Sequence, residues 1–385
     1  LHLWYRRQRQ MCIRDSTSVT FNSTATVNSD NTGTKRDLTI NTGAGAVAMQ
    51  GIIGGSVALD AISINAATAG AGTVEVANIA GAAGAVSIGN GATATLTLDG
   101  TTYTSTGAQT YEANDINITA GADVTFTTTN TAVEFQDGAA GQIVLSDATD
   151  LTITTSGGNI TIAPTIAGTD SGGGGNTAED ITLNAAGGTV TLSNTGAAVL
   201  ATDIGDVTLT GATIALSNSI TSTGANSAGS TATIDINGAV TLNDNDITIT
   251  TGGAGIDFSS TIVSGSTTPR ALTIAQGAGA VVINGNIGGT ANNDVGNITI
   301  GATGNNGNIT LSGDIGTDSV AGAAIVALGN ASTGSITLGG AEYNTSGTQT
   351  YTADDYNLNG TAITLTTSAD TVSYTHLTLP TIPQV

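Results

Sequence analysis

Short runs that read apolar–polar–apolar recur along almost the whole chain. Examples are Leu151–Ile153, Ile160–Ile162, Ile181–Leu183 and Val190–Leu192, each with threonine in the middle position. Because neighbouring side chains of a strand point to opposite faces of a sheet, this alternation predicts strands that are buried on one side. Turns rich in Gly, Asn and Asp separate the runs, and no ten-residue stretch shows a convincing helical period. The pattern therefore predicts an all-β protein.

The spacing of the runs indicates how the strands are connected. Successive runs start every 7–10 residues in many places, for example at Ile116, Val124 and Val133. Three such strands make a coil of about 20–27 residues, a length within the range of stacked structural repeats. The predicted fold is a right-handed parallel β-helix, or β-solenoid. With about 4.8 Å per coil, residues 17–371 would form roughly 15 coils and a rod about 70 Å long.

A second repeat is much longer than one coil. Residues 101–117 (TTYTSTGAQTYEANDIN) align without gaps to residues 341–357 (AEYNTSGTQTYTADDYN), at an offset of 240. Upstream, residues 34–55 align to residues 268–289 at an offset of 234, so the second copy contains a net insertion of six residues. The chain thus contains about one and a half copies of a module of about 240 residues. No linker is visible between the copies, which predicts one continuous solenoid.

The two ends differ in composition from the rest of the chain. Four of the seven basic residues lie in Leu1–Ser16 together with His2, Trp4 and Cys12, and the C-terminal residues Val372–Val385 contain His376 and two of the four prolines. Both ends resemble translated sequencing-adapter read-through. We therefore interpret residues 1–16 and 372–385 as non-native flanks and residues 17–371 as the solenoid body.

The charge of the body excludes some classes of partner. Residues 17–371 contain 28 acidic and three basic residues, a net charge of −25, so the surface should repel nucleic acid and anionic lipid. Val, Ile and Leu recur throughout, which argues against an acidic disordered chain. No stretch approaches the 18 consecutive apolar residues of a membrane-spanning helix.

The most distinctive residues belong to a short element that is present in both copies of the module. One hypothesis is a receptor-contacting ridge of tyrosine and glutamine. The favoured one is structural, with tyrosine capping a wide corner of the coil and glutamine hydrogen-bonded to the turn backbone. The signature residues are Gly107, Gln109, Thr110 and Tyr111 in the first copy and Gly347, Gln349, Thr350 and Tyr351 in the second.

Few residues suit catalysis. The body lacks His and Cys, so no Ser or Cys nucleophile has a His partner, and its basic residues are Lys35, Arg36 and Arg270, too few for a typical polysaccharide lyase. A hydrolase needs only two carboxylates, so a glycan-active β-helix enzyme stays open as an alternative. We expect no catalytic site and no cofactor.

Two segments suggest metal binding, and several threonine rows suggest ice binding. Gly252–Asp257 fits part of a calcium β-roll nonapeptide and Asn243–Asp246 is a cluster of oxygen ligands, but both lack the remaining ligand pattern, so no metal site is expected. Threonine rows such as Thr93–Thr97, Thr125–Thr127 and Thr248–Thr250 raise the alternative of an ice-binding solenoid. Such a face needs equal coils that stack threonine in register, and the uneven spacing of the runs argues against it.

The stretches TKRDLTINTGAGAVAMQGIIGG (34–55) and TSTGAQTYEANDINITAGADVTFTTT (104–129) resemble repeats of filamentous-haemagglutinin-type exoproteins and related giant bacterial surface adhesins. The resemblance covers about residues 17–371 and rests on GAQTY (107–111) and GTQTY (347–351) followed by strand runs. It implies a β-helix at the bacterial cell surface or outside the cell, which acts as a structural or adhesive shaft. The partners it implies are host-cell or matrix glycans and proteins, or neighbouring copies.

Overall fold

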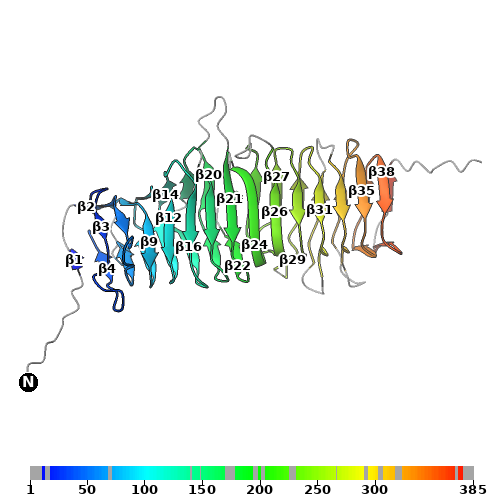
Figure 1. The fold of residues 1–385 in the computed structure, drawn as a ribbon. Coiled ribbons are helices and arrows are strands. Elements are labelled where there is room, and N and C mark those ends of the chain that lie inside the picture. Colours follow the sequence, from blue (N-terminus) through cyan, green and yellow to red (C-terminus); the bar gives the residue numbers. More distant parts are fainter. Residues whose placement is uncertain are drawn as a thin grey trace, which may run out of the picture.

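The computed structural model is a straight rod of stacked strands (Figure 1). It describes residues 11–13, 18–67, 72–138, 141–147, 149–169, 178–193, 198–200, 204–224, 231–265, 267–289, 294–301, 307–316, 323–368 and 372–375. Among these residues there are strands and turns but no helix, so no helix there is long and apolar enough to cross a membrane. All strand pairings among the described residues are parallel, and the strands stack into a β-solenoid, which confirms the predicted fold class.

Each turn contributes strands to three faces, here called A, B and C in the order in which the chain visits them. Face B is a 15-stranded sheet. It includes a strand from turns that have only an isolated β-bridge on face A. Faces A and C form a single 23-stranded sheet, since two long strands bend around the corner between them. Beyond Ile262, face A continues through isolated β-bridges at Ile287 and Ile315.

The strands of each face follow one another along the rod. Face A contains β1 (Met11–Ile13), β4 (Leu38–Ile40), β7 (Ile62–Ile64), β10 (Val86–Gly89), β13 (Gln109–Ala113), β16 (Val133–Asp137), β19 (Ile160–Ile162), β22 (Thr189–Leu192), the second halves of β24 (Ile204–Leu216) and β26 (Ile234–Leu242), β29 (Ile262–Ser264), β36 (Glu342–Thr345) and β39 (Thr364–Thr367). Face B contains β2 (Ser18–Phe21), β5 (Ala46–Met49), β8 (Val74–Val76), β11 (Thr95–Leu98), β14 (Asp115–Ile118), β17 (Gln142–Leu145), β20 (Thr165–Gly168), β23 (Ala198–Leu200), β25 (Ser219–Ser222), β27 (Ile247–Thr251), β30 (Leu272–Ala275), β32 (Ile298–Ile300), β34 (Val326–Leu328), β37 (Gln349–Thr352) and β40 (Val372–Thr375). Face C contains β3 (Thr26–Val27), β6 (Ile52–Ile53), β9 (Ile79–Ala82), β12 (Thr102–Ser105), β15 (Val124–Thr127), β18 (Leu151–Thr154), β21 (Glu179–Asn184), the first halves of β24 and β26, β28 (Ile256–Phe258), β31 (Val281–Ile283), β33 (Ile309–Leu311), β35 (Ser335–Leu338) and β38 (Asp355–Leu358).

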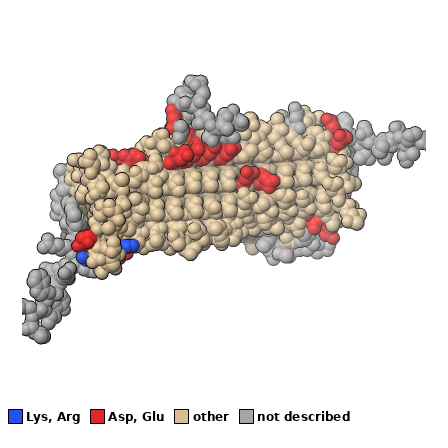
Figure 2. Space-filling model, in the orientation of Figure 1, with Lys and Arg blue, Asp and Glu red and all other residues tan. Residues whose placement is uncertain are grey.

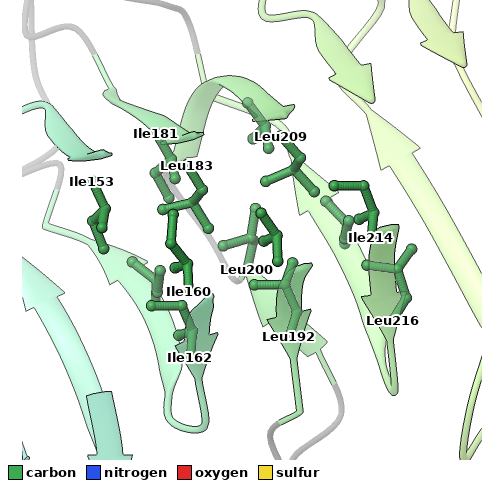
Figure 3. Close-up of a cluster of buried hydrophobic side chains, with 14 of the residues drawn as sticks. Ile153, Ile160, Ile162, Ile181, Leu183, Leu192, Leu200, Leu209, Ile214 and Leu216 are labelled. Carbon is green, nitrogen blue, oxygen red and sulfur yellow. The ribbon is translucent and has the colours of Figure 1, made fainter. Parts of the chain in front are cut away.

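The core is one continuous column of aliphatic side chains inside the three faces. Ile153 and Leu183 from face C, Ile162 from face A and Leu200 from face B point toward one another and have no exposed surface (Figure 3). Complete burial of a Val, Leu or Ile side chain stabilises the fold by about 1.5–3 kcal/mol relative to exposure. Aromatic residues make up only 3% of the chain, so the core is thin and is built almost entirely by the inner positions of the alternating runs.

The turns differ in length, yet the strands stay in register. Leu200 pairs with Ile220 across one of the shorter turns, whereas Leu151 pairs with Ile181 across one of the longer turns. Because the extra residues lie between the strands, the stacked strands keep their inward and outward positions. The turn from Leu151 to Ile181 is slightly longer than the predicted coil of about 20–27 residues.

The 240-residue repeat does not return to the same face. From β12 the stacked strands of face C run through β15, β18, β21, β24, β26, β28, β31, β33 and β35, which makes nine turns. The homologue of β12 in the second copy is β36, the next strand after β35, and it lies on face A. One module therefore spans nine and one-third turns, and the second copy is displaced by one face.

Short strands also form within the two flanks. β1 pairs with β4, and β40 pairs with β37, in which Tyr351 aligns with Tyr374. A parallel stack can pair with any extended segment that follows it, so these contacts do not bear on the origin of the flanks. That origin stays a prediction.

Close stacking of the corners makes some glycines indispensable, which yields a test of the stacked fold. A Cβ atom on Gly188 would lie 2.3 Å from the carbonyl oxygen of Gly158 in the preceding turn, whereas one on the adjacent Gly187 would meet nothing within 4 Å. We expect Gly188→Ala to destabilise the fold by about 1–3 kcal/mol or more through overpacking. Gly187→Ala, the matched control, should leave the thermal unfolding midpoint unchanged or slightly higher. Equal midpoints for the two variants would contradict the stacking of these corners.

Candidate functional site

The first signature element contains the end of the connection from β12 to β13 and the start of β13, and the side chains of Gln109 and Tyr111 point into the core. Gln109 and Tyr111 have no exposed surface. The Nε2 atom of Gln109 donates to the carbonyl oxygens of Tyr103 and Thr127 and to Oγ of Ser105, each at 3.0 Å, so one of these bonds shares a hydrogen. The hydroxyl of Tyr111 donates to Oε1 of Gln109 at 3.0 Å. The element is a buried and hydrogen-bonded network.

The second element repeats this network atom by atom. Nε2 of Gln349 donates to the carbonyl oxygen of Tyr343 at 2.7 Å, to Oγ1 of Thr345 at 3.1 Å and to the carbonyl oxygen of Thr366 at 2.8 Å. The hydroxyl of Tyr351 donates to Oε1 of Gln349 at 3.0 Å. Gln349 and Tyr351 are also completely buried. The same sequence element thus forms the same contacts on two different pairs of faces.

The glycine of each signature is explained by close approach of the preceding turn. A Cβ atom on Gly107 would lie 2.4 Å from the carbonyl carbon and oxygen of Gly84, and one on Gly347 would lie 2.5 Å from the carbonyl oxygen of Ala324. Contacts this short do not occur between a real Cβ atom and a backbone carbonyl. A side chain at either position would therefore force neighbouring turns apart.

Aromatic side chains of the next turn pack on the first network. The ring of Tyr103 stacks on Phe126 with centroids 4.6 Å apart, and Tyr111 stacks on Phe135 at 5.1 Å. Burial raises the pKa of Tyr111 well above its ordinary value, and burial also raises the pKa of Tyr343 to about 12. These phenols are therefore neutral at any physiological pH.

The burial of the signature residues bears on the two hypotheses for their role. A glutamine or tyrosine without exposed surface cannot contact a receptor on the folded rod, and only Thr110 and Thr350 of the signatures face outward between buried neighbours. Sequence reasoning missed Ser105 and Thr345 as partners of the glutamines. The signal was a hydroxyl residue four positions before each glutamine, in both copies.

We expect the buried network to contribute strongly to stability. Gln109→Leu removes the donors to two carbonyl groups and the acceptor of the Tyr111 hydroxyl. With about 1–3 kcal/mol for each polar group left unpaired, the loss should reach about 3 kcal/mol. Thr110→Ala on the outer side of the same strand is the control, and its effect should stay within about 0.5 kcal/mol. Denaturant unfolding measures both, and similar losses for the two variants would show that the network is not required.

Stacked carboxylates, here called the acidic column, follow one corner of face C. Oδ1 of Asp150 accepts from the backbone nitrogen of Asp180 at 2.9 Å, and Oδ1 of Asp180 accepts from that of Asp206 at 2.6 Å. Oδ1 of Asp206 in turn accepts from the backbone nitrogen of Thr233 at 2.6 Å. Each carboxylate thus binds the start of the next strand. Figure 2 shows acidic side chains gathered near the middle of the rod.

The pKa of Asp150, the first residue of the acidic column, is raised above its ordinary value. Partial burial is the largest cause, and the charges of Asp180, Asp123 and Asp206 add to it, whereas the bond from the Asp180 amide opposes it. The folded chain therefore holds a proton on Asp150 more readily than the unfolded chain does. Its contribution to stability is fully present below the ordinary pKa of 3.8 and is lost as the pH rises through the raised folded-state value.

Asp150→Asn should therefore stabilise the fold at pH 7, because Oδ1 can still accept the Asp180 amide while the repulsion is removed. The gain should be below about 1 kcal/mol, since the carboxylate is partly solvated. The difference from the parent chain should shrink as the pH falls toward 3.8. The exposed Asp115→Asn is a control for loss of one charge, and thermal unfolding between pH 4 and 7 measures all three proteins. A constant difference across this range would contradict the assigned pKa shift.

The segments considered for calcium have structural contacts of their own. Within Gly252–Asp257 the chain enters β28, in which Ile256 points inward and Asp257 outward. In Asn243–Asp246, Oδ1 of Asp246 accepts from the backbone nitrogen of Ala271 at 2.8 Å. Among the residues that the structure describes, no three His, Cys, Asp or Glu side chains are grouped so that they could hold a metal ion.

The basic residues do not form a cluster. Nε of Arg36 donates to Asp30 at 2.8 Å in an exposed ion pair, and Nε of Arg270 donates to the carbonyl oxygen of Asn243 at 3.1 Å. These two arginines occupy homologous positions of the long repeat, at an offset of 234, and therefore lie in turns far apart along the rod. The described residues thus bring no pair of basic side chains to one carboxylate.

Outward threonines form two columns on face C, here called the threonine array. They come from β12, β15, β18, β21 and β24, whose strands pair in register. The first column contains Thr102, Thr125, Thr152, Thr182 and Thr208. The second column contains Thr104, Thr127, Thr154, Asn184 and Thr210. Figure 2 shows the regular rows of neutral side chains on this side of the rod.

No protein-family model matches the chain, and no curated protein or solved structure is significantly similar to it. The fold is established by the strand pairings alone. The resemblance to filamentous-haemagglutinin-type repeats continues to rest on the two sequence stretches that suggested it, and it stays a prediction.

Proposed function

We propose that the chain is a shaft segment of a secreted or surface-exposed bacterial adhesin or biofilm-matrix protein, without catalysis. The observation that carries the proposal is the unbroken stacking of turns from the first copy of the module into the second. Strand pairing continues from β26 through β28 and β31 to β33 without a gap between domains. A rod of this kind can hold a binding region away from the cell.

The surface supports contacts with cells or matrix more than contacts with nucleic acid. The body has a net charge of −25, and threonine and other small polar residues fill many outward positions. Its partners would be glycans or proteins of host cells or matrix, or neighbouring copies, held by many weak contacts along a face. Phosphate backbones would be repelled by the charge.

A glycan hydrolase is the alternative that needs a separate test. Asp235 and Asp257 lie directly opposite each other on β26 and β28, and burial followed by the charge of Asp257 raises the pKa of Asp235. Two carboxylates on neighbouring turns are close to the spacing of about 5–5.5 Å found in retaining glycosidases. The pair lies on the strand surface between Thr208 and Val282, where it forms part of a sheet face.

Beads coated with the full chain test the proposal. We expect them to attach to host-cell or matrix-coated surfaces, or to one another, more than beads coated with the same chain after heat unfolding. The unfolded chain is the matched control because it has the same composition and charge. Equal attachment of both preparations would refute an adhesive rod. Release of reducing ends from polysaccharides, abolished by Asp235→Asn, would instead establish the enzyme.

A further inference from the structure

The threonine array is a regular lattice of small side chains on a rigid sheet. We propose that this array binds the surface of ice and holds an ordered layer of water on its two columns. This inference is independent of the shaft proposal, since a shaft does not need such a face. It rests on the register, the spacing and the free hydroxyl groups of the array.

The backbone fixes the spacing of the array in two directions. Within a strand the two columns are two residues apart, or about 6.6–6.8 Å, and neighbouring turns are about 4.8 Å apart. Both repeats are close to distances between oxygen atoms on low-index planes of hexagonal ice. Five consecutive turns maintain them, from Thr102 in β12 to Thr208 in β24. A water layer can therefore match the array along and across the rod.

The register removes the objection raised by the uneven spacing of the runs. The turn from Thr152 to Thr182 is longer than the turn from Thr102 to Thr125, yet the two threonines of each pair are direct partners. The segments between the strands contain the extra residues. Unequal turns are therefore compatible with equal stacking on face C.

The hydroxyl groups of the array are available for water. Within the described part of the chain, none of the nine threonine side chains of the array forms a hydrogen bond to another protein group. Threonine is stiff at χ1, so its hydroxyl and methyl groups are held in place at little further entropic cost. Thr102 is exposed to solvent, and the other eight threonines of the array are partly exposed.

Charge is kept to the edges of the array. Both columns consist of neutral side chains, whereas the acidic column follows one edge and Asp235 and Asp257 occupy the next two turns of the first column. The array also contains no aromatic ring on which a sugar could stack. Its chemistry thus fits a water lattice better than it fits a glycan.

Inhibition of ice recrystallisation by the full chain tests the inference, with ice itself as the probe. We expect the chain to inhibit recrystallisation and to concentrate into a growing ice front. Thr152→Tyr places a bulky ring at the centre of the array and should abolish both effects. Thr161→Tyr is the matched control, because Thr161 is an outward threonine between buried isoleucines on face A, and it should behave as the parent chain does.

Two further results keep the test decisive. Circular dichroism and the unfolding midpoint show whether Thr152→Tyr folds, and Thr125→Tyr in the neighbouring turn provides a second variant if it does not. A parent chain that leaves ice growth unchanged would overturn the inference. Equal loss in the face A control and the array variants would overturn it as well, because binding would then not reside in the array.

Discussion

Parallel hydrogen bonding between successive turns is the constraint on which the rest of the structure depends. Each turn lies about 4.8 Å from the next, so every position has a structural neighbour directly before and after it. Inward positions must therefore hold side chains that stack, as Ile153 does on Leu183. Corner positions must leave room for a backbone carbonyl, as Gly188 does. Carboxylates such as Asp150 can bind the next turn only because the same spacing brings its amide within reach.

Polar groups can enter so thin a core only as a complete network. Gln109 satisfies two carbonyl groups and the Tyr111 hydroxyl, and Gln349 does the same for its own copy. A partly satisfied network would cost more than an apolar core, because each unpaired group retains its desolvation penalty. This explains why glycine, glutamine and tyrosine recur together. The internal contacts that both copies form are sufficient to explain the signature, without a ligand.

The strands and their parallel stacking were predictable from the sequence, but the register between successive turns was not. The run Leu151–Ile153 is the core of β18, because alternation is a local property of the chain. By contrast, Val207–Leu209 and Ile214–Leu216 belong to one long strand, β24, which bends around a corner. The burial of Gln109 depends on the carbonyl of Thr127, which is supplied by the next turn. Register across turns of unequal length is set by non-local contacts. The sequence therefore showed single rows such as Thr125–Thr127, but not that these rows line up from turn to turn.

The length of the module determines how its surfaces are displayed. Because one module spans nine and one-third turns, the homologues of β12, β13 and β14 lie one face further around the rod. On face A the second copy has Glu342 and Asn344 of β36 at the positions of Thr102 and Thr104. Only the next strand, β39, supplies threonines, Thr364 and Thr366, so the pattern of the array is repeated only in part. An internal network tolerates this rotation, since all three faces supply equivalent backbone acceptors. An outward-facing site does not tolerate the rotation, because its copies come to lie on different faces around the axis and not along a single side. A chain of three modules would present such a site on all three faces.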